Sequence, residues 1–303
     1  MNGVIELSGL TKVFGRHRAV DDLTCTISPG VVTGFLGPNG AGKTTTMKMI
    51  VGLDRPTAGT ATIGGQPYRA LRDPLRTVGA LLDAKWLHPS RTARDHLRWL
   101  AASNRIATAR VDEVLDVVGL SSVGDKKAGA LSLGTSQRLG IAAALLGDPQ
   151  VLLFDEPVNG LDPEGIRWVR TLMRTLAADG RTVLVSSHLL AEMANTADRL
   201  VVIGRGRLIA STTVAEFTSR SGAAAVRVRS PQLDTLAKVL ADAAVDVTQE
   251  PSALAVRGVA IEVIGELAAR NGIVLHELST RQASLEDAYL ELTDTAVEHR
   301  AQA

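Results

Sequence analysis

The sequence predicts an α/β protein with two domains, and three observations support this prediction. Apolar runs of strand length alternate with stretches whose apolar residues recur at helical spacing, as in residues 151–154, 163–178 and 182–186. Such alternation is typical of a parallel sheet with helices packed over it. A glycine-rich segment, residues 37–45, lies between a predicted strand and a predicted helix. Beyond residue 222 the order changes to strand, helix, strand, strand, helix, strand, which indicates a smaller α+β domain of ferredoxin-like type.

The first domain, residues 1–222, should have a mixed sheet core with a helical insert at about residues 85–135, where Thr92 is a suitable N-cap. The second, residues 223–303, is expected to be an accessory or regulatory domain. Strands are predicted at residues 4–7, 19–27, 31–35, 60–63, 78–82, 151–154, 182–186, 200–203, 224–229, 245–249, 253–256 and 273–278. Helices are predicted at residues 43–51, 136–146, 163–178, 189–195, 231–243 and 260–271.

The composition limits the possible partners and compartments. The chain has 303 residues, with 33 Lys and Arg against 32 Asp and Glu. Because no strong overall field of either sign results, nucleic acid is not an expected partner. Cys25 is the single cysteine, so no internal disulfide can form and a reducing cytoplasm is expected. Since the sequence shows neither a signal peptide nor an apolar run of membrane-spanning length, another chain must supply any membrane spans.

The glycine-rich segment fits the phosphate-binding pattern G-x-x-x-x-G-K-[ST]. Its glycines let backbone N–H groups surround an anion, and the following helix adds the positive end of its dipole. Lys43 is expected to reach the β- and γ-phosphates of a nucleoside triphosphate, and Thr44 to hold Mg²⁺. A simple glycine-rich turn is the alternative, and the flanking strand and helix argue against it. The expected binding residues here are Gly37, Asn39, Gly40, Gly42, Lys43, Thr44 and Thr45.

Two further predicted strands end in polar residues at the same edge of the sheet. Asp155 and Glu156 follow residues 151–154, and His188 follows residues 182–186. Open α/β sheets bind ligands at the carboxyl ends of their strands. We therefore expect Asp155 to meet Mg²⁺, Glu156 to activate the attacking water as a general base, and His188 to contact the γ-phosphate.

These segments and two others resemble the ATP-binding subunit of ABC transporters, over residues 5 to about 215. Residues 131–135, Leu-Ser-Leu-Gly-Thr, are similar to the family's signature sequence. Residues 159–162, Asn-Gly-Leu-Asp, are similar to the loop that crosses its dimer interface. Phe14 matches the aromatic residue that stacks on adenine, and His188 matches the switch histidine.

The resemblance implies ATP and Mg²⁺ as ligands and two kinds of partner. Two copies pair head to tail, and each ATP lies between the phosphate loop of one subunit and the signature of the other. Ser132, at a helix start, would then offer an anion site. An integral-membrane permease is the second partner, which places this cytoplasmic chain at the membrane surface. The nucleotide-contacting residues added by the resemblance are Phe14, Asp83, Ser132, Gly134 and Asp162.

Three residues depart from the family pattern. Leu133 occupies a position where glycine is usual, and Thr135 one where glutamine is frequent. Asp83 replaces the usual glutamine before the insert, and in this it resembles antibiotic-resistance and bacteriocin-immunity exporters. We expect its carboxylate close to Mg²⁺, through a bridging water rather than directly. Residues 284–293 look like the ending of drug-exporter ATPases, and they equally fit an amphipathic closing helix capped by Ser284.

We therefore expect an ATPase that drives export of a drug, antibiotic or peptide through a separate permease. A soluble ABC-type ATPase acting on a macromolecular target is the alternative, although the two tandem cores or heptad repeats expected of it are absent from the sequence. A P-loop GTPase is disfavoured because no Asn-Lys-x-Asp motif occurs. A nucleotide sensor without hydrolysis is disfavoured because Glu156 and His188 are in place.

Overall fold

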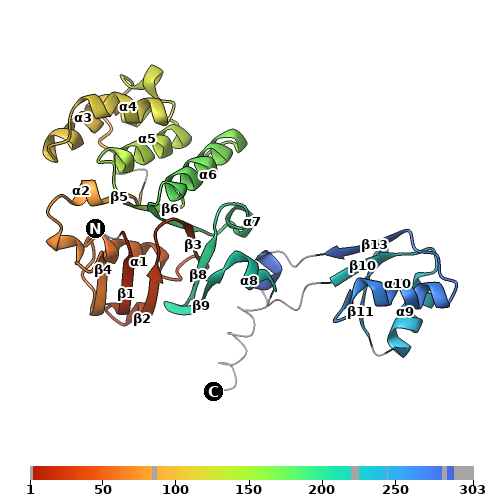
Figure 1. Ribbon diagram of the computed structural model, residues 1–303. Coiled ribbons are helices and arrows are strands. Elements are labelled where there is room, and N and C mark those ends of the chain that lie inside the picture. The colour runs from red at the N-terminus through yellow and green to blue at the C-terminus, as the bar shows by residue number, and fades with distance from the viewer. Residues whose placement is uncertain (1–2, 84–86, 220–224, 244, 282–284, 290–303) are drawn as a thin grey trace. The chain divides into compact units, whose positions relative to one another are not determined.

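The computed structural model of the chain describes residues 3–83, 87–219, 225–243, 245–281 and 285–289. Its contacts separate two compact units, Met1–Thr212 and Thr213–Ala303 (Figure 1). The sequence pattern placed the domain boundary later, at residue 222. The predicted end of an independently folding first domain at residue 222 is therefore still a prediction.

The centre of the first unit is a six-stranded sheet made of β3 (Val32–Leu36), β5 (Val78–Leu81), β6 (Val151–Asp155), β7 (Thr182–Ser187), β8 (Arg199–Gly204) and β9 (Arg207–Thr213). The strand order is β5-β6-β7-β3-β8-β9. Four neighbouring pairs in this sheet are parallel: β5–β6, β6–β7, β7–β3 and β3–β8. Every residue of β7 is buried, as expected for a parallel strand with helices over both faces.

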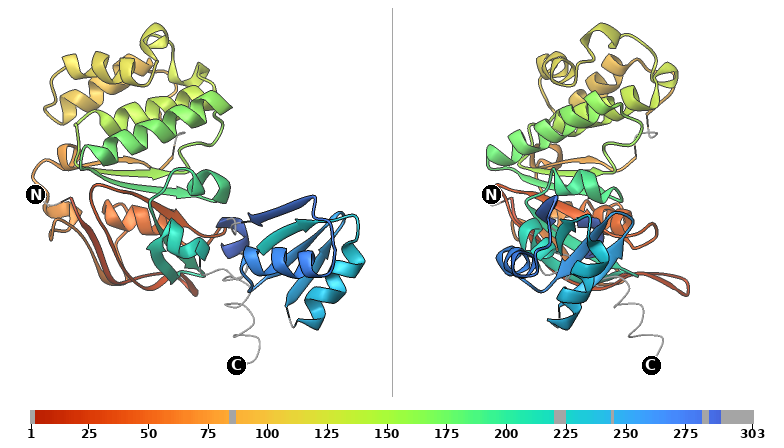
Figure 2. Two further views of the ribbon diagram at one scale, coloured as in Figure 1. Left: turned by 45° about the vertical axis from the view of Figure 1, so that its right-hand side comes forward. Right: turned by 90° about the vertical axis from the view of Figure 1, so that its right-hand side faces the viewer.

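Helices cover both faces of this sheet (Figure 1, Figure 2). On one face lie α5 (Leu133–Leu145) and α6 (Pro163–Ala178). On the other face lies α1 (Lys43–Ile50), which directly follows β3 and the glycine-rich loop. Because β3, β6 and β7 are parallel neighbours, their carboxyl ends meet at one edge, beside the start of α1.

A second, antiparallel sheet packs beyond α1. It consists of β1 (Ile5–Phe14), β2 (His17–Ile27) and β4 (Ala58–Ile63), in the order β2-β1-β4. One apolar core fills the space between the two sheets and α1. Its buried side chains include Leu10, Leu23, Phe35, Met47, Ile50, Leu153 and Ile203.

A helical insert separates β5 from β6, as the sequence predicts. It contains α3 (Ala93–Ser103) and α4 (Ala109–Val117). Thr92 caps α3, because its hydroxyl oxygen accepts a 3.0 Å hydrogen bond from the Asp95 N–H. The other short helices of this unit are α2 (Pro74–Thr77), α7 (Leu190–Ala194) and the 3₁₀ turns η1 (Tyr68–Ala70), η2 (Ser121–Val123) and η3 (Ala128–Ala130).

The second unit begins with α8 (Val214–Ser219) and continues with β10 (Ala225–Arg229), α9 (Leu233–Asp242), β11 (Asp246–Glu250), β12 (Ala253–Arg257), α10 (Ile261–Arg270) and β13 (Glu277–Arg281). Its sheet is antiparallel, in the order β11-β12-β10-β13. This βαββαβ order with split strands is the ferredoxin-like arrangement. The core between sheet and helices contains Val226, Val228, Leu236, Leu240, Leu254, Val256 and Ile264.

Several elements differ from the sequence predictions: β1 runs to Phe14 instead of residue 7, and neither α2 nor α8 was predicted. β9 was not predicted; a two-residue turn at Arg205 and Gly206, both with positive φ, connects it to β8. β13 begins at Glu277 instead of residue 273, because the chain there bonds to a loop: the Val274 carbonyl accepts a hydrogen bond from Ser230 at 2.7 Å. α5 begins at Leu133, three residues before the predicted start.

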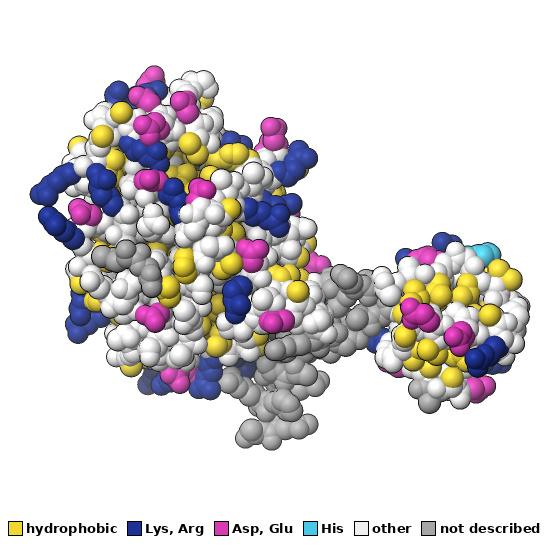
Figure 3. Space-filling model, in the orientation of Figure 1, with side chains coloured by type: hydrophobic (Ala, Val, Ile, Leu, Met, Phe, Trp, Pro, Cys, Tyr) yellow, Lys and Arg dark blue, Asp and Glu magenta, His cyan; other side chains and the backbone are white. Residues whose placement is uncertain are grey.

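Charges of both signs lie on the face of each unit that Figure 3 draws, where Lys and Arg side chains lie among Asp and Glu side chains. The described residues contain no helix that is long and apolar enough to span a bilayer. Within the predicted closing helix, residues 285–289 are helical, whereas Ser284 and residues 290–293 lie outside the described residues.

Candidate nucleotide-binding site

The phosphate loop joins β3 to α1, and close packing explains its glycines. A Cβ atom on Gly37 would lie 2.5 Å from the main-chain oxygen of Ile203. Gly42 has a φ of +105°, and its Cβ would lie 2.4 Å from the main-chain oxygen of Ala19. Any other residue at these two positions would displace the backbone. The loop is therefore pressed against neighbouring strands in one conformation.

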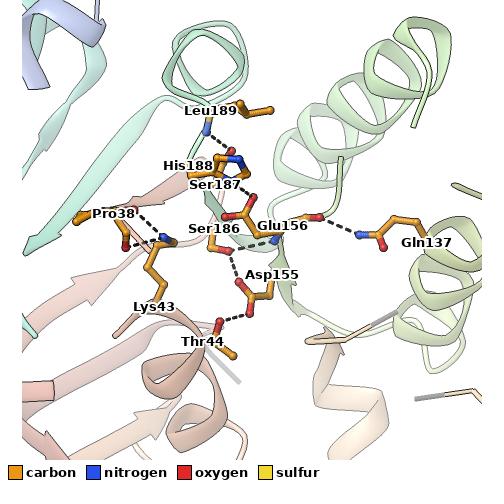
Figure 4. Close-up of polar contacts among 11 residues, drawn as sticks. Pro38, Lys43, Thr44, Gln137, Asp155, Glu156, Ser186, Ser187, His188 and Leu189 are labelled. Atoms are coloured by element: carbon orange, nitrogen blue, oxygen red, sulfur yellow. Dashed lines mark hydrogen bonds and ion pairs between the residues drawn. The ribbon is translucent and has the colours of Figure 1, made fainter. Parts of the chain in front are cut away.

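Lys43, the first residue of α1, is 6% exposed and points back along the loop (Figure 4). Its Nζ donates hydrogen bonds to the main-chain oxygens of Gly37, at 2.6 Å, and Pro38, at 3.3 Å. Burial lowers the pKa of Lys43 from its ordinary value, and the carboxylates of Glu156 and Asp155 partly oppose that shift. The ammonium group thus lies between the loop and the two acids at the end of β6.

Asp155 connects α1 to β7. One of its carboxylate oxygens accepts a hydrogen bond from the Thr44 hydroxyl at 2.5 Å, and the other accepts one from the Ser186 hydroxyl. Ser186 is fully buried near the end of β7, so it fixes the carboxylate from the sheet side. Sequence reasoning predicted Thr44 and Asp155 but missed Ser186, which no local pattern distinguishes from an ordinary strand residue.

Glu156 has a left-handed backbone conformation, with a φ of +50°. Such a conformation costs a residue other than glycine about 1–3 kcal/mol, so surrounding contacts must hold it. Its N–H donates to the Ser186 hydroxyl at 3.1 Å, and its carbonyl oxygen accepts from Gln137 Nε2 at 2.9 Å. Its Oε2 lies 2.9 Å from His188 Nδ1. Figure 4 shows these four residues around the end of β6.

The donor set fits a magnesium ion. Thr44 Oγ1 and Asp155 Oδ2 are hard oxygen atoms that converge beside the phosphate loop. Mg²⁺ in nucleotide sites typically takes one or two such protein ligands and completes its shell with phosphates and water. The described residues contain no group of three or more His, Cys, Asp or Glu side chains placed to hold a metal ion. A metal that binds together with a nucleotide needs no such group.

A cavity of about 350 Å³ lies along the outer side of the loop. Phe14, at the end of β1, is 47% exposed beside it, and Lys12 Nζ lies 4.8 Å from the centre of its ring. His17, at the start of β2, also lines the cavity. The predicted residues that line this cavity are Phe14, Asn39, Gly40, Gly42, Lys43, Thr44, Thr45, Asp155 and Glu156.

The signature segment lies at the start of α5 and does not line this cavity. Ser132 is the N-cap, and its hydroxyl accepts the Thr135 N–H at 3.2 Å. Leu133 is 49% exposed and packs on Gly160, where a Cβ would lie 2.4 Å from Leu133 Cδ2. A Cβ on Gly134 would lie 2.9 Å from the Gly160 carbonyl oxygen. The signature is therefore packed against the 159–162 loop of its own chain.

Four further predicted residues do not line the cavity either: Gly37, Asp83, Asp162 and His188. Asp162 caps α6, since its Oδ1 accepts the Gly165 N–H at 2.8 Å. Asp83 is exposed and follows β5, which pairs with β6. It therefore lies at the same edge of the sheet as Asp155. Its expected water-mediated contact with a metal stays a prediction.

The parallel sheet, the phosphate loop and the two acids at the end of β6 define a P-loop nucleotide hydrolase. The family model for ABC transporters matches residues 20–159. The bacitracin transport ATP-binding protein BcrA of Bacillus licheniformis is 41% identical over 212 residues, which cover 69% of each chain. The uncharacterized ABC transporter ATP-binding protein YhcH of Bacillus subtilis is 36% identical over 304 residues, covering 97% of each chain. The chain belongs to the ATP-binding proteins of ABC transporters, as predicted.

Solved structures confirm the predicted fold class and the hydrolytic activity of the family. An ATP-binding subunit of an ABC transporter matches with a TM-score of 0.65 and 27% identity, covering 72% of this chain and 92% of that one. A dimeric ATP-binding cassette with ADP and Pi bound, in a post-hydrolysis state, matches with a TM-score of 0.63 and 26% identity, covering 69% and 98%. Residues 224–286 match a second family model, a domain of unknown function (DUF8746).

Proposed function

We propose that this chain is the ATPase subunit of an exporter, in which Glu156 acts as the general base. One observation carries the proposal: hydrogen-bonded contacts run without a break from the phosphate loop to the base. Thr44 contacts Asp155, Asp155 contacts Ser186, Ser186 contacts the main chain of Glu156, and Glu156 contacts His188. A loop that binds phosphate and a base that activates water are thus parts of one network.

ATP binds with its phosphates on the loop and its adenine towards Phe14. Lys43 now donates to two main-chain oxygens. Phosphate oxygens are charged and therefore stronger acceptors, so they take over these hydrogen bonds. Phe14 offers an exposed ring at the edge of the same cavity, which suits stacking on a flat base.

Thr44 and Asp155 would hold Mg²⁺, with Asp83 behind a bridging water. When bound, the ion neutralises charge on the phosphate oxygens. The Thr44 hydroxyl supports this assignment because it already lies 2.5 Å from the Asp155 carboxylate, so the two oxygens need only small adjustments to share one ligand.

Glu156 accepts a proton from the attacking water. The water oxygen forms a bond to the γ-phosphorus while the bond from that phosphorus to the bridging β,γ-oxygen breaks, which yields ADP and phosphate. His188 Nδ1, 2.9 Å from Glu156 Oε2, fixes the carboxylate, and its ring is the predicted contact of the γ-phosphate. A positioned general base of this kind contributes about a hundredfold or more to the rate.

The signature segment completes the site of a second copy. Ser132 and Gly134 stand at a helix start and do not line their own chain's cavity. A helix start with free N–H groups is an anion site, and the γ-phosphate of ATP held by another copy is its occupant. We infer a head-to-tail homodimer that closes around two ATP molecules, with Asp162 and its loop between the two sites.

A separate membrane permease completes the transporter, and this chain acts from the cytoplasm at the membrane surface. Relatives of similar sequence are named for bacitracin transport and for Nod factor export. We propose that the cargo here is likewise an antibiotic, a drug or a peptide that leaves the cell.

Mixing two inactive variants tests the head-to-tail arrangement. Lys43→Ala removes the phosphate-loop cation, whereas Ser132→Asp keeps a good helix cap but repels the γ-phosphate. Random mixed dimers have one intact composite site, so the mixture should regain up to roughly a quarter of the wild-type ATPase rate. The control mixture pairs Ser132→Asp with the double variant and has no intact site. A mixture of the single variants that stays as inactive as this control would refute the arrangement.

A further inference from the structure

Gln137 is a buried polar side chain whose role the mechanism above leaves open. It lies in α5, five residues after Ser132, and is 4% exposed. Most of the residues that follow it in α5 are buried and apolar, from Leu139 to Leu145. A buried amide requires hydrogen-bond partners. Its Nε2 donates to the main-chain oxygen of Glu156 at 2.9 Å (Figure 4).

Both peptide groups of Glu156 are held by other elements. On its N-terminal side the N–H donates to the Ser186 hydroxyl, at 3.1 Å, and to the Ser186 carbonyl, at 3.3 Å. On its C-terminal side the carbonyl accepts the hydrogen bond from Gln137. Since β7 fixes one side of the Cα atom and α5 fixes the other, the two contacts together define the left-handed conformation. That conformation brings the carboxylate to His188.

The helix that carries Gln137 is itself packed closely against the sheet. A Cβ on Gly79 of β5 would lie 1.9 Å from the Ala144 carbonyl oxygen. A Cβ on Gly140 would lie 2.5 Å from the Leu81 side chain. Such backbone contact leaves no room for α5 to shift independently of β5. Ser132 at the start of the helix and Gln137 in its second turn are therefore parts of one rigid element.

We propose that Gln137 is a positioning residue that holds Glu156 in its active conformation and links the signature helix to the base. The inference rests on the proposed function, in which Glu156 is the base and Ser132 serves the ATP of a second copy. Because Ser132 and Gln137 share α5, occupation of one composite site affects the base of the other through this hydrogen bond. Three residues of a single chain carry this coupling between the two composite sites: Ser132, Gln137 and Glu156.

Gln137→Met tests the positioning role, because methionine has similar length but no donor. The kcat should fall roughly tenfold to a hundredfold, since a misplaced group loses most of its effect. The dissociation constant of ATP should stay within about twofold, because no phosphate-loop residue changes. If Gln137→Met does not fold, Gln137→Asn is the second variant, because it keeps the amide but is one methylene shorter. It should likewise lower kcat and leave the dissociation constant of ATP within about twofold.

Thr182→Val is the matched control. Thr182 is fully buried at the opposite end of β7, and its hydroxyl donates to the Gly3 carbonyl at 2.5 Å. Like Gln137→Met, this replacement removes a buried side-chain donor to a main-chain oxygen. The lost hydrogen bond, however, lies at the other end of β7 from Ser186. Thermal stability should fall while kcat stays at the wild-type value. A loss of kcat as large as that of Gln137→Met would show that the effect is general destabilisation.

A double-mutant cycle separates this inference from the proposed function. In the Glu156→Gln background, Gln137→Met should cause almost no further loss of turnover, because the base that it positions is already absent. If the two losses multiply, Gln137 does not act through Glu156 and the inference fails. If Glu156→Gln alone keeps wild-type turnover, the proposed function fails instead. If only Gln137→Met keeps wild-type kcat, the inference alone fails.

Discussion

The Thr44 hydroxyl donates a 2.5 Å hydrogen bond to the Asp155 carboxylate, which joins the start of α1 to the end of β6. The two residues are 111 positions apart. In the sheet, β7 lies between β6, which ends in Asp155, and β3, which precedes the phosphate loop and α1. The phosphate loop and the acidic end of β6 were predicted from two separate sequence motifs. The contact shows that they are parts of one site. The contact also places both expected metal ligands within reach of a single ion.

Lys43→Ala should abolish ATP binding. Among the described residues that line the cavity, Lys43 is the single Lys or Arg, so its loss leaves the phosphate charge without a cationic partner. Equilibrium dialysis with ATP measures the effect. Lys48→Ala is the control, because Lys48 lies in the last turn of α1 and does not line the cavity. Unchanged affinity of Lys43→Ala would overturn the assignment of the phosphate loop.

Asp83→Ala should separate hydrolysis from transport. Asp83 is exposed after β5, at the entry to the helical insert, and does not line the nucleotide cavity. We expect basal ATPase activity within a few-fold of wild type for Asp83→Ala and Asp83→Gln. With reconstituted permease, Asp83→Ala should lose the stimulation that wild type shows. A basal rate as low as that of Glu156→Gln would instead make Asp83 a catalytic residue.

Deletion of residues 223–303 should leave ATP binding intact. The ferredoxin-like unit has its own apolar core, and every predicted nucleotide contact lies earlier in the chain. Dimerisation or transport should weaken instead. ATP affinity and the thermal unfolding midpoint of the truncated chain are the measurements. A truncated chain that cannot fold would show that the boundary at residue 222 is wrong.

Local patterns in the sequence are sufficient to predict the elements that build the site. The phosphate loop is recognisable because its glycines, its lysine and the flanking strand and helix are contiguous. Residues 163–178 are predicted as a helix with the bounds that α6 has, and in the structure Asp162 caps this helix and Pro163 begins it. The parallel order follows from alternating strands and helices.

The residues that support the base could not be predicted in this way. Ser186 contacts Glu156 across 30 positions and Gln137 contacts it across 19, so their roles depend on how β7, α5 and β6 pack. His17 lines the cavity only because the β1–β2 hairpin folds beside the loop. β13 was misplaced because Ile273 is a buried apolar residue that precedes the strand without pairing in it.

Turnover of the Glu156→Gln variant in the presence of ATP tests the central claim most directly. Glutamine keeps the size of the side chain and a carbonyl acceptor for His188, but it cannot take a proton from water. The variant should bind ATP with wild-type affinity, lose about a hundredfold or more of its turnover, and elute as an ATP-bound dimer on size exclusion. A variant that stays monomeric with ATP and hydrolyses it at the wild-type rate would contradict the account.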